Sequence, residues 1–409
     1  MTSPKDVSRS RTYSVLVIPP QDYLRHPHPT RLHHIFERFE NPFQVTILNM
    51  RIRTSPKIRG SRHEVIEVGH AARSMLLSYL LGYADFHLQL VNLIRKRNYD
   101  CMILSSIISP IVPLLASGRP VIFDYKDIYS LSASAPFSFP VRTFVYWVVR
   151  FFEEILLKFR MTVVVPSPSL QGIMRRKFGI NAEIITNGVD THVFKPLSEQ
   201  EKKSVREKLG IQQSDFCLSY LGSIENWLDL ETVLCALEQV PHAKLVLIGG
   251  AVRSSEYLQS ILSLSERKRL TKRVLPTGFR TQHDAAEIVG ASDGAIIPFR
   301  TDTELSQVAL PDKLFEYLAA GVPVISTRLP SVVRIFGNSI HFYDTVNELS
   351  QTIRNLIVEK DQSCCDVSRS TPAENYDWGL IASKYQCFLK KIVETGRRPQ
   401  TRSDGSDRC

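Results

Sequence analysis

A lysine and a glutamate stand three residues apart in the segment ALPDKLFEYLAAGVPVIST, which covers residues 309–327. On a helix, this spacing places Lys313 and Glu316 on one face. A carboxylate there can accept two hydrogen bonds from the vicinal hydroxyls of a ribose, while Lys313 and the helix N-terminus suit a diphosphate. An ordinary intrahelical ion pair is the alternative interpretation of the same two residues.

The residues around this pair predict a helix followed by a buried strand. Pro311 suits the start of the helix, and the strand is VPVIST at 322–327. Similar apolar strands alternate with helical stretches along most of the chain, at 13–18, 43–49, 99–105, 119–124, 161–166, 182–186, 216–222, 243–249, 273–278 and 294–299. This alternation predicts the α/β class, with two doubly wound parallel sheets.

The length of 409 residues exceeds what one hydrophobic core supports and fits two domains. The strand and helix alternation breaks within 187–210, which places the boundary near residue 196. The composition, 43% hydrophobic and 22% charged, excludes collagen-like, coiled-coil and wholly disordered chains. The expected order is a disordered tail (1–11), an N-terminal domain (12–196), a C-terminal domain (197–377), a helix (378–395) that could pack back on the N-terminal domain, and a disordered tail (396–409).

The positive charge is concentrated in the first half of the chain. Residues 1–195 hold 25 Lys and Arg against 14 Asp and Glu, whereas the remainder holds 26 against 27. Such a field attracts nucleic acid, anionic lipid or a phosphorylated substrate, although solubility alone is an alternative explanation.

The seven cysteines form no CxxC pair, which fits a reducing compartment. The N-terminal residues lack the apolar run of a signal peptide. The longest uncharged run, 101–118, contains two prolines and predicts a strand followed by a helix. We therefore expect a cytoplasmic protein without a transmembrane helix.

Several of these segments together resemble the family 4 glycosyltransferases. Residues 309–327 are similar to the donor-binding motif of that family, and 163–196, 220–250 and 274–300 are similar to its interlobe region and donor-domain units. The resemblance implies the GT-B fold, in which two Rossmann-like domains face a central cleft. It also implies a retaining enzyme that takes a nucleotide sugar such as a UDP- or GDP-sugar on its C-terminal domain, with no metal or other cofactor.

Position by position, the resemblance makes Glu316 the second glutamate of the family pattern, the residue that holds the nucleotide ribose. The first glutamate of that pattern would stand at Val308, so the carboxylate expected to contact the transferred sugar is missing. Backbone N–H groups of Val308, Ala309 and Leu310 could cradle the diphosphate as a nest instead. Glu304 could substitute for the missing carboxylate, or be an exposed loop residue.

Five residues of the C-terminal domain are further candidates. Gly222 and Ser223 end a strand where phosphate or sugar could approach the backbone, although an ordinary turn is the alternative. Lys313 and Arg300 are expected to neutralise the leaving diphosphate. Arg280, after another strand, is a weaker candidate for contact with the base.

In the N-terminal domain, Asp124 and Asp127 follow a strand where family members often carry an active-site histidine. Either could orient the acceptor hydroxyl, although helix capping is the commoner use of such an aspartate. His26, His28 and His33, with Arg31, could bind an acidic acceptor or phosphate, whereas no carboxylate or cysteine completes a metal shell there.

Residues 141–160 are apolar and aromatic but interrupted by charges, which excludes a membrane span. A buried domain helix is the favoured interpretation, and a helix resting on a membrane surface is the alternative.

The sequence thus predicts a glycosyltransferase with an unidentified glycan or lipid-linked acceptor, either cytoplasmic or peripheral at the cytoplasmic face of an anionic membrane, and no nucleic-acid partner. A GT-B nucleotide-sugar epimerase and a non-catalytic basic binding protein are the alternatives.

Overall fold

The computed structural model describes residues 11–395 except 27, 73–74, 108, 110, 117, 136, 253 and 362–372. The two tails that the sequence predicts to be disordered therefore lie almost wholly outside the described residues. The chain divides into two compact units. Unit 1 comprises Met1–Pro166, Leu170–Thr186 and Gly379–Cys409, and unit 2 comprises Ser167–Ser169 and Asn187–Trp378.

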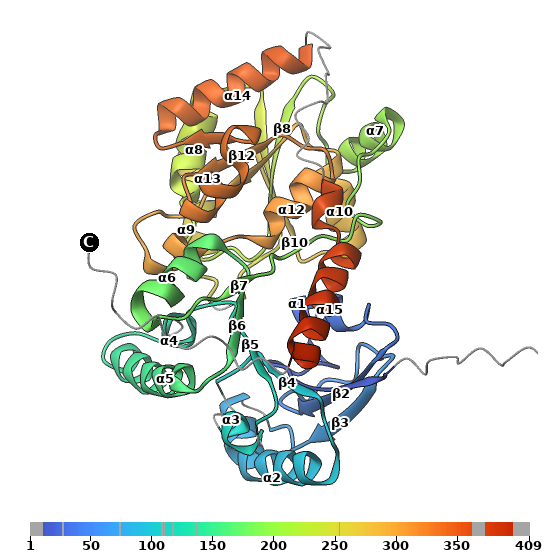
Figure 1. The fold of residues 1–409 in the computed structure, drawn as a ribbon. Coiled ribbons are helices and arrows are strands. Elements are labelled where there is room, and N and C mark those ends of the chain that lie inside the picture. The colour runs from blue at the N-terminus through green and yellow to red at the C-terminus, as the bar shows by residue number, and fades with distance from the viewer. Residues whose placement is uncertain are drawn as a thin grey trace, which may run out of the picture. The chain divides into compact units, whose positions relative to one another are not determined.

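The described part of unit 1 has a seven-stranded parallel sheet in the order β3-β2-β1-β4-β5-β6-β7 (Figure 1). Its strands are β1 (Tyr13–Ile18), β2 (Phe43–Met50), β3 (Glu64–Val68), β4 (Cys101–Leu104), β5 (Val121–Asp124), β6 (Thr162–Val165) and β7 (Glu183–Ile184). Its helices are α1 (Arg31–Phe36), α2 (Met75–Lys96), α3 (Val112–Leu115), α4 (Tyr129–Ser134), α5 (Val141–Lys158), α6 (Pro168–Phe178) and α15 (Trp378–Thr395).

Unit 2 has a six-stranded parallel sheet in the order β10-β9-β8-β11-β12-β13 among its described residues. Its strands are β8 (Phe216–Leu221), β9 (Ala243–Ile248), β10 (Val274–Gly278), β11 (Gly294–Ile297), β12 (Val324–Thr327) and β13 (His341–Tyr343). Its helices are α7 (Glu199–Lys208), α8 (Leu230–Gln239), α9 (Glu256–Arg267), α10 (Gln282–Gly290), α11 (Glu304–Val308), α12 (Asp312–Ala319), α13 (Pro330–Phe336) and α14 (Val346–Asp361), with 3₁₀ turns η1 (Gly337–Ser339) and η3 (Ala373–Tyr376).

In each sheet the strand order reverses beside the first strand, between β1 and β4 and between β8 and β11. Parallel sheets of this kind bind ligands at the carboxyl ends of their strands, where the order reverses. The carboxyl ends of β8 and β11 are therefore the positions in unit 2 at which a ligand site is expected.

The unit 2 sheet is covered on both faces, as its apolar strands predict. Phe216, Leu218 and Tyr220 of β8 pack with α8, α9 and α14, whereas Cys217 between them packs with the opposite core, which contains residues of α10, α12 and α13. The Asp229 side chain caps α8 by accepting a hydrogen bond from the Thr232 N–H at 3.2 Å.

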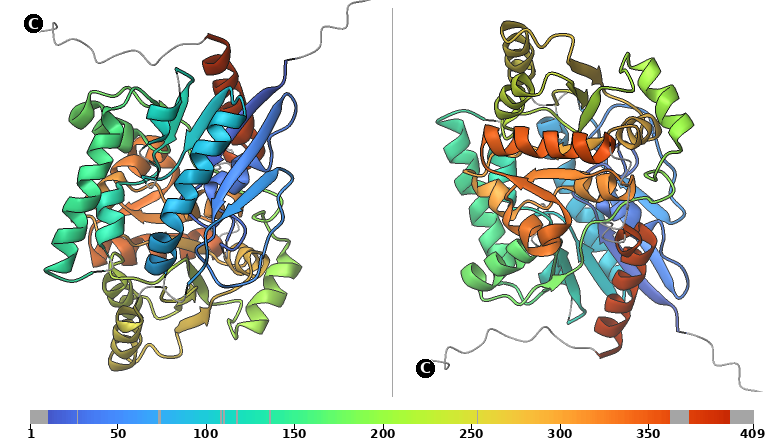
Figure 2. Two further views of the ribbon diagram at one scale, coloured as in Figure 1. Left: turned by 90° about the horizontal axis from the view of Figure 1, so that it is seen from below. Right: turned by 90° about the horizontal axis from the view of Figure 1, so that it is seen from above.

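The last helix returns to unit 1 and completes its core. In the views of Figures 1 and 2, α15 runs beside β1, β2 and α1. The ring centroids of Tyr385 and Phe36 lie 5.8 Å apart, and the Tyr13 hydroxyl donates to Glu394 at 2.6 Å. Unit 1 is thus built from an N-terminal and a C-terminal portion of the chain.

Helix α5 differs from the favoured expectation of a buried helix. Of its 18 residues, Glu153, Leu156 and Leu157 are buried, while Phe144, Trp147 and Phe151 are 61–70% exposed. The expectation was wrong because an apolar composition does not reveal whether other elements cover the whole circumference of a helix.

Candidate functional site

Lys313 of α12 lies at the carboxyl end of β8. Its Nζ donates to the Tyr220 hydroxyl at 3.3 Å and stands 4.9 Å from the ring centroids of both Tyr220 and Phe299. A Cβ at Gly222 would lie 3.1 Å from Lys313 Cε and Nζ, and Gly222 has a φ of +131°. The glycine therefore supplies both the backbone conformation and the space for the ammonium.

Glu316 follows one turn later on the same face of α12. No described residue forms a hydrogen bond or ion pair with its carboxylate, so the intrahelical pair with Lys313 is not formed. Burial, with the nearby Asp312 charge, raises the pKa of Glu316 to about 7, although Lys313 opposes this shift. Burial lowers the pKa of Lys313 to about 8, against the carboxylates of Glu316 and Asp312. Two partly buried groups of opposite sign that form no ion pair, each with a shifted pKa, are typical of a ligand site.

Tyr317, which was not a candidate on sequence grounds, fixes α12 against the sheet. Its hydroxyl accepts a hydrogen bond from the Leu221 N–H at 2.8 Å and lies 3.5 Å from the Ile296 carbonyl oxygen. The side chain is buried and connects the helix to the ends of β8 and β11. A tyrosine beside the motif glutamate is the only sequence signal for this role.

Replacing Tyr317 with phenylalanine is expected to lower the free energy of unfolding by about 1–2 kcal/mol, because the Leu221 N–H loses its acceptor inside the protein. Nucleotide affinity should fall as well, since α12 loses its anchor. Urea titration and calorimetric nucleotide titration measure the two effects. Tyr376→Phe is the control, because no described residue forms a hydrogen bond with the Tyr376 hydroxyl. Unchanged stability in Tyr317→Phe would contradict the anchoring role.

The candidate residues Gly222 and Ser223 follow β8, at the edge of the unit 2 sheet where Gly222, Gly249 and Gly278 stand at the carboxyl ends of β8, β9 and β10. This edge is called the glycine edge below. A Cβ at Gly249, after β9, would lie 2.1 Å from the Gly222 carbonyl oxygen, so only glycine fits there. The Gly249 N–H donates to the Gly278 carbonyl at 3.0 Å, which joins the ends of β9 and β10. The Ser223 carbonyl accepts from Tyr220, and no described partner binds its side chain.

Arg300 follows β11, but its guanidinium is committed within unit 2. Its Nε donates to the Asn226 carbonyl at 3.1 Å, and its Nη2 pairs with Glu231 at 3.1 Å. Because Glu231 balances its charge, the geometry argues against the expected role of Arg300 in neutralising a leaving group. It holds the segment between β8 and α8 instead.

Val308, Ala309 and Leu310 do not form a nest. Ala309 has φ −60° and ψ 134°, and none of the three has a positive φ, so their N–H groups do not converge. The Ala309 N–H donates to the Ser306 carbonyl at 3.4 Å, and the Val308 carbonyl accepts from Ser167 at 3.2 Å. Glu304 is exposed in the first turn of α11.

Arg280 is exposed after β10, and no described residue forms an ion pair with it. Its neighbour Phe279 is 60% exposed, and the Phe279 ring approaches to 3.1 Å of a Cβ built at Gly250. An exposed aromatic ring beside the glycine edge can stack on a base.

Asp124 in unit 1 is fully buried and paired with Arg31, whose Nε lies 3.2 and 3.3 Å from its two carboxylate oxygens. Arg31 also donates to the carbonyls of Ile185 and Thr186 at 2.7 and 2.6 Å. Neither side chain is available to a substrate in this arrangement, which corrects the expected roles of Asp124 at the acceptor and Arg31 at phosphate.

Asp127 and His33 also have structural partners. Asp127 accepts from the Ile128 N–H at 2.8 Å and from the hydroxyl of Ser132 in α4, so both of its carboxylate oxygens have partners at this helix. His33 accepts from the Thr30 N–H through Nδ1 at 2.9 Å and donates to the Tyr23 carbonyl through Nε2. Burial lowers the pKa of His33, consistent with a neutral ring. Within the described residues, no three His, Cys, Asp or Glu side chains are grouped for a metal ion.

Comparison with known proteins identifies both halves of the chain. The family model "Glycosyltransferase Family 4" matches residues 30–193, and "Glycosyl transferases group 1" matches residues 216–359. A putative teichuronic acid biosynthesis glycosyltransferase, TuaH of Bacillus subtilis, is 24% identical over 291 residues, 70% of this chain and 68% of the relative. The chain is a family 4-like glycosyltransferase.

Other matches agree with this family. D-inositol 3-phosphate glycosyltransferase of Segniliparus rotundus is 24% identical over 151 residues, 36% of this chain and 32% of the relative. Sucrose-phosphate synthase of Thermosynechococcus elongatus has a TM-score of 0.72 at 16% identity, covering 94% of this chain and 100% of that structure. Anabaena HepE in complex with UDP-glucose has a TM-score of 0.69 at 16% identity, covering 92% and 99%.

The predicted GT-B fold of this glycosyltransferase is confirmed by its two parallel-sheet units and these structural neighbours. The matches support an enzyme and favour neither the epimerase nor the non-catalytic alternative. Among the helices of the described part of the chain, none has the length and apolarity needed to span a bilayer.

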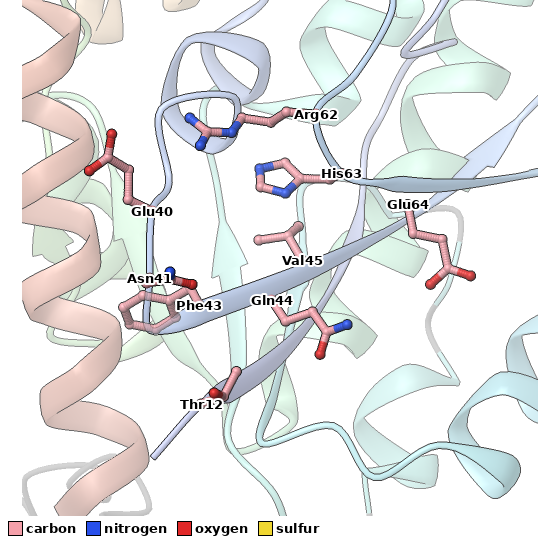
Figure 3. A pocket seen from close by; sticks show the side chains of 9 residues that line it. All are labelled: Thr12, Glu40, Asn41, Phe43, Gln44, Val45, Arg62, His63 and Glu64. Carbon is pink, nitrogen blue, oxygen red and sulfur yellow. The ribbon is translucent and has the colours of Figure 1, made fainter. Parts of the chain in front are cut away.

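A pocket of about 600 Å³ lies in unit 1 of the glycosyltransferase, away from the carboxyl ends of the strands where a ligand is expected (Figure 3). It is bounded by Thr12, Phe43 and Glu64, where β1, β2 and β3 begin. Arg62 in its lining donates to the Glu37 carbonyl at 3.2 Å, and His63 Nε2 lies 2.6 Å from the Phe36 carbonyl. It is at the amino ends of the strands and does not include any candidate site residue.

Proposed function

We propose that this glycosyltransferase moves a sugar from a nucleoside diphosphate donor held by unit 2 to an acceptor hydroxyl, with retention at the anomeric carbon. The observation that carries the proposal is the pair Lys313 and Glu316, which share a face of α12 without forming an ion pair. The relative HepE has been solved with UDP and with UDP-glucose, which supports a nucleotide-sugar donor.

In the proposed complex, Glu316 accepts hydrogen bonds from the ribose hydroxyls, and Lys313 with the first N–H groups of α12 faces the diphosphate. Phe279 stacks on the base. The bond between the anomeric carbon and the diphosphate breaks, and its electron pair leaves with the diphosphate. The acceptor oxygen forms the new bond on the same face, and its proton passes to the departing phosphate. The protein contributes positioning and charge, and Lys313 supplies the cation without a metal or other cofactor.

We also propose a glycan or lipid-linked acceptor, with a cytoplasmic enzyme peripheral to an anionic membrane. The basic first half of the chain supports this, as do relatives named for teichuronic acid biosynthesis (TuaH) and lipopolysaccharide biosynthesis (WaaG).

A thermal-shift screen with UDP, GDP and ADP tests the donor site, because a ligand at about 100 times its Kd adds about 2.7 kcal/mol to the stability of the folded state. At least one nucleotide should raise the melting temperature. The matching nucleotide sugar should then release nucleoside diphosphate only when an acceptor is present. Absence of any shift would overturn the donor site, and isomerised sugar without an acceptor would overturn transfer.

The affinity for the selected nucleotide should peak between about pH 7 and 8. Below pH 7, Glu316 becomes protonated and accepts ribose hydrogen bonds poorly; above pH 8, Lys313 loses the charge that attracts the diphosphate. Calorimetric titration from pH 5.5 to 9.5 measures both limbs. The Glu316→Gln variant is the control, because it retains the titration of the nucleotide but lacks that of the carboxyl. An identical acid limb in the variant would exclude Glu316 as its cause.

A further inference from the structure

Unit 1 carries an exposed aromatic stripe, defined here as Phe139, Phe144, Trp147, Val148 and Phe151. Phe139 is 83% exposed, and Phe144, Trp147 and Phe151 are 70%, 64% and 61% exposed. The last four residues of the stripe follow the spacing i, i+3, i+4, i+7 and therefore lie along one side of α5. Monomeric soluble proteins rarely leave such a contiguous apolar surface without a partner.

The opposite side of α5 is firmly attached to unit 1. Glu153 is fully buried, and its carboxylate accepts hydrogen bonds from the Tyr125 hydroxyl at 2.6 Å, the Tyr129 N–H at 2.9 Å and the Ser130 hydroxyl at 2.9 Å. These donors belong to the loop after β5 and the start of α4. The aromatic stripe is thus presented by a helix that is fixed to the carboxyl edge of the unit 1 sheet.

Basic residues adjoin the stripe at the C-terminal end of the helix. Lys158 continues the spacing of the stripe and is exposed, as is Arg160 just beyond the helix, whereas the spacing places Arg142 on the side of α5 that carries Glu153. The acidic residues of α5 leave this charge in place, because Glu153 is buried and Glu154 pairs with Arg150 at 2.7 Å. An apolar face with Trp and Phe beside exposed cations matches the composition of helices that lie in a membrane interface.

We propose that the aromatic stripe docks α5 flat on a bilayer that contains anionic lipid. An 18-residue helix is about 27 Å long, and the cations at its C-terminal end would reach headgroups while the rings enter the acyl boundary. Figures 1 and 2 show α5 at the outer margin of unit 1.

A second copy of the chain fits this surface poorly. In a twofold contact the same patch meets itself. Parallel α5 helices would pair Lys158 and Arg160 with their equivalents, and antiparallel helices would place these cations against the apolar N-terminal end of the other stripe. Neither arrangement offers them an opposite charge from the stripe, whereas anionic headgroups complement them.

The attachment through Glu153 gives this docking a consequence for the substrate. The loop after β5, at the edge where unit 1 is expected to bind its ligand, is held at a fixed position relative to the bilayer surface. The acceptor class that suits this placement is a saccharide or phosphosaccharide carried on a lipid. This last step rests on the proposed transferase function, whereas the docking itself does not.

Sedimentation of the full chain with phosphatidylcholine vesicles, with and without about 30% phosphatidylglycerol, tests the docking. We expect binding to the anionic vesicles, and a drop of at least tenfold for the Trp147→Ser/Phe151→Ser variant. Lys158→Gln/Arg160→Gln should weaken binding by about fivefold per cation, and raised salt should also weaken binding.

Two matched variants in unit 2 serve as controls, Val252→Ser/Val358→Ser for exposed apolar area and Lys203→Gln/Lys208→Gln for charge. Both should bind vesicles as the unchanged chain does, and all variants should keep its circular dichroism spectrum and nucleotide affinity.

Lack of vesicle binding by the unchanged chain, or equal binding by the stripe variant, overturns the proposal. A dimer in solution that the stripe variant abolishes, without vesicle binding, would assign the stripe to a second copy instead. Because nucleotide affinity is measured without lipid, failure of docking and failure of the donor site are distinguishable.

Discussion

Replacing Glu316 with glutamine is expected to weaken nucleoside diphosphate binding by about 100-fold, with the fold intact. Hydrogen bonds to a charged acceptor are worth about 1.5–3 kcal/mol each, and the amide retains the shape of the side chain but only part of this strength. The carboxylate has no hydrogen-bond partner among the described residues, so its loss should not destabilise the protein. Burial raises the pKa of Glu316 to about 7, so above that pH the buried carboxylate is charged and opposes folding. Its removal should therefore slightly increase the stability of the protein in that pH range.

Isothermal calorimetry with the nucleotide selected by thermal shift measures this effect. Glu304→Gln is the matched control, because Glu304 is exposed in α11 and could replace the missing first glutamate only by contacting the sugar. We expect Glu304→Gln to bind the nucleoside diphosphate normally. Equal affinities for Glu316→Gln and the unchanged chain would remove the ribose contact on which the proposed donor site depends.

Replacing Asp124 with asparagine is expected to lower the free energy of unfolding by about 3–5 kcal/mol, because it leaves the Arg31 guanidinium buried without its counter-charge. Both side chains are almost fully buried, and the pair connects α1 to the end of β5 and to the backbone at Ile185 and Thr186. Urea denaturation followed by circular dichroism measures the change.

Two comparisons make this expectation specific. Glu199→Gln removes one partner of the exposed pair with Lys202 and should change stability by less than about 0.5 kcal/mol. Arg31→Met/Asp124→Leu removes both buried charges and should recover much of the loss. A loss below about 1 kcal/mol for Asp124→Asn would show that the pair is hydrated, and Asp124 would return as a candidate for the acceptor site.

Strands with continuous apolar residues were predictable from the sequence, because both faces of a parallel sheet are covered. The expected strands at 13–18, 43–49 and 216–222 correspond to β1, β2 and β8. Two strands were not predicted, β3, whose sequence EVIEV is polar enough for an edge, and the three-residue β13. Both lie at a sheet edge, where a strand can be polar or short and still pair with its one neighbour.

The candidate site was predictable where it follows from helical spacing or from the position of a strand end. Lys313 and Glu316 share a face of α12 as their spacing indicates, and Gly222, at the end of β8, adjoins Lys313 as the parallel-sheet rule indicates. The partners of Arg300 and Asp124 were not predictable, because Glu231 and Arg31 are brought to them by tertiary folding over separations of 69 and 93 residues. A charged residue at a strand end therefore indicates a position, while its availability depends on partners elsewhere in the chain.

The return of α15 to unit 1 has a consequence during synthesis on the ribosome. Residues 187–378 are inserted between two portions of unit 1, so unit 2 emerges complete while unit 1 still lacks the aromatic contacts of Tyr385. Domains fold as units during translation, which allows the later unit to finish first here. Unit 1 cannot complete its core until the final helix has been synthesised. A chain stopped before residue 379 would hold a folded unit 2 and an incomplete unit 1, whose exposed apolar core chaperones can recognise.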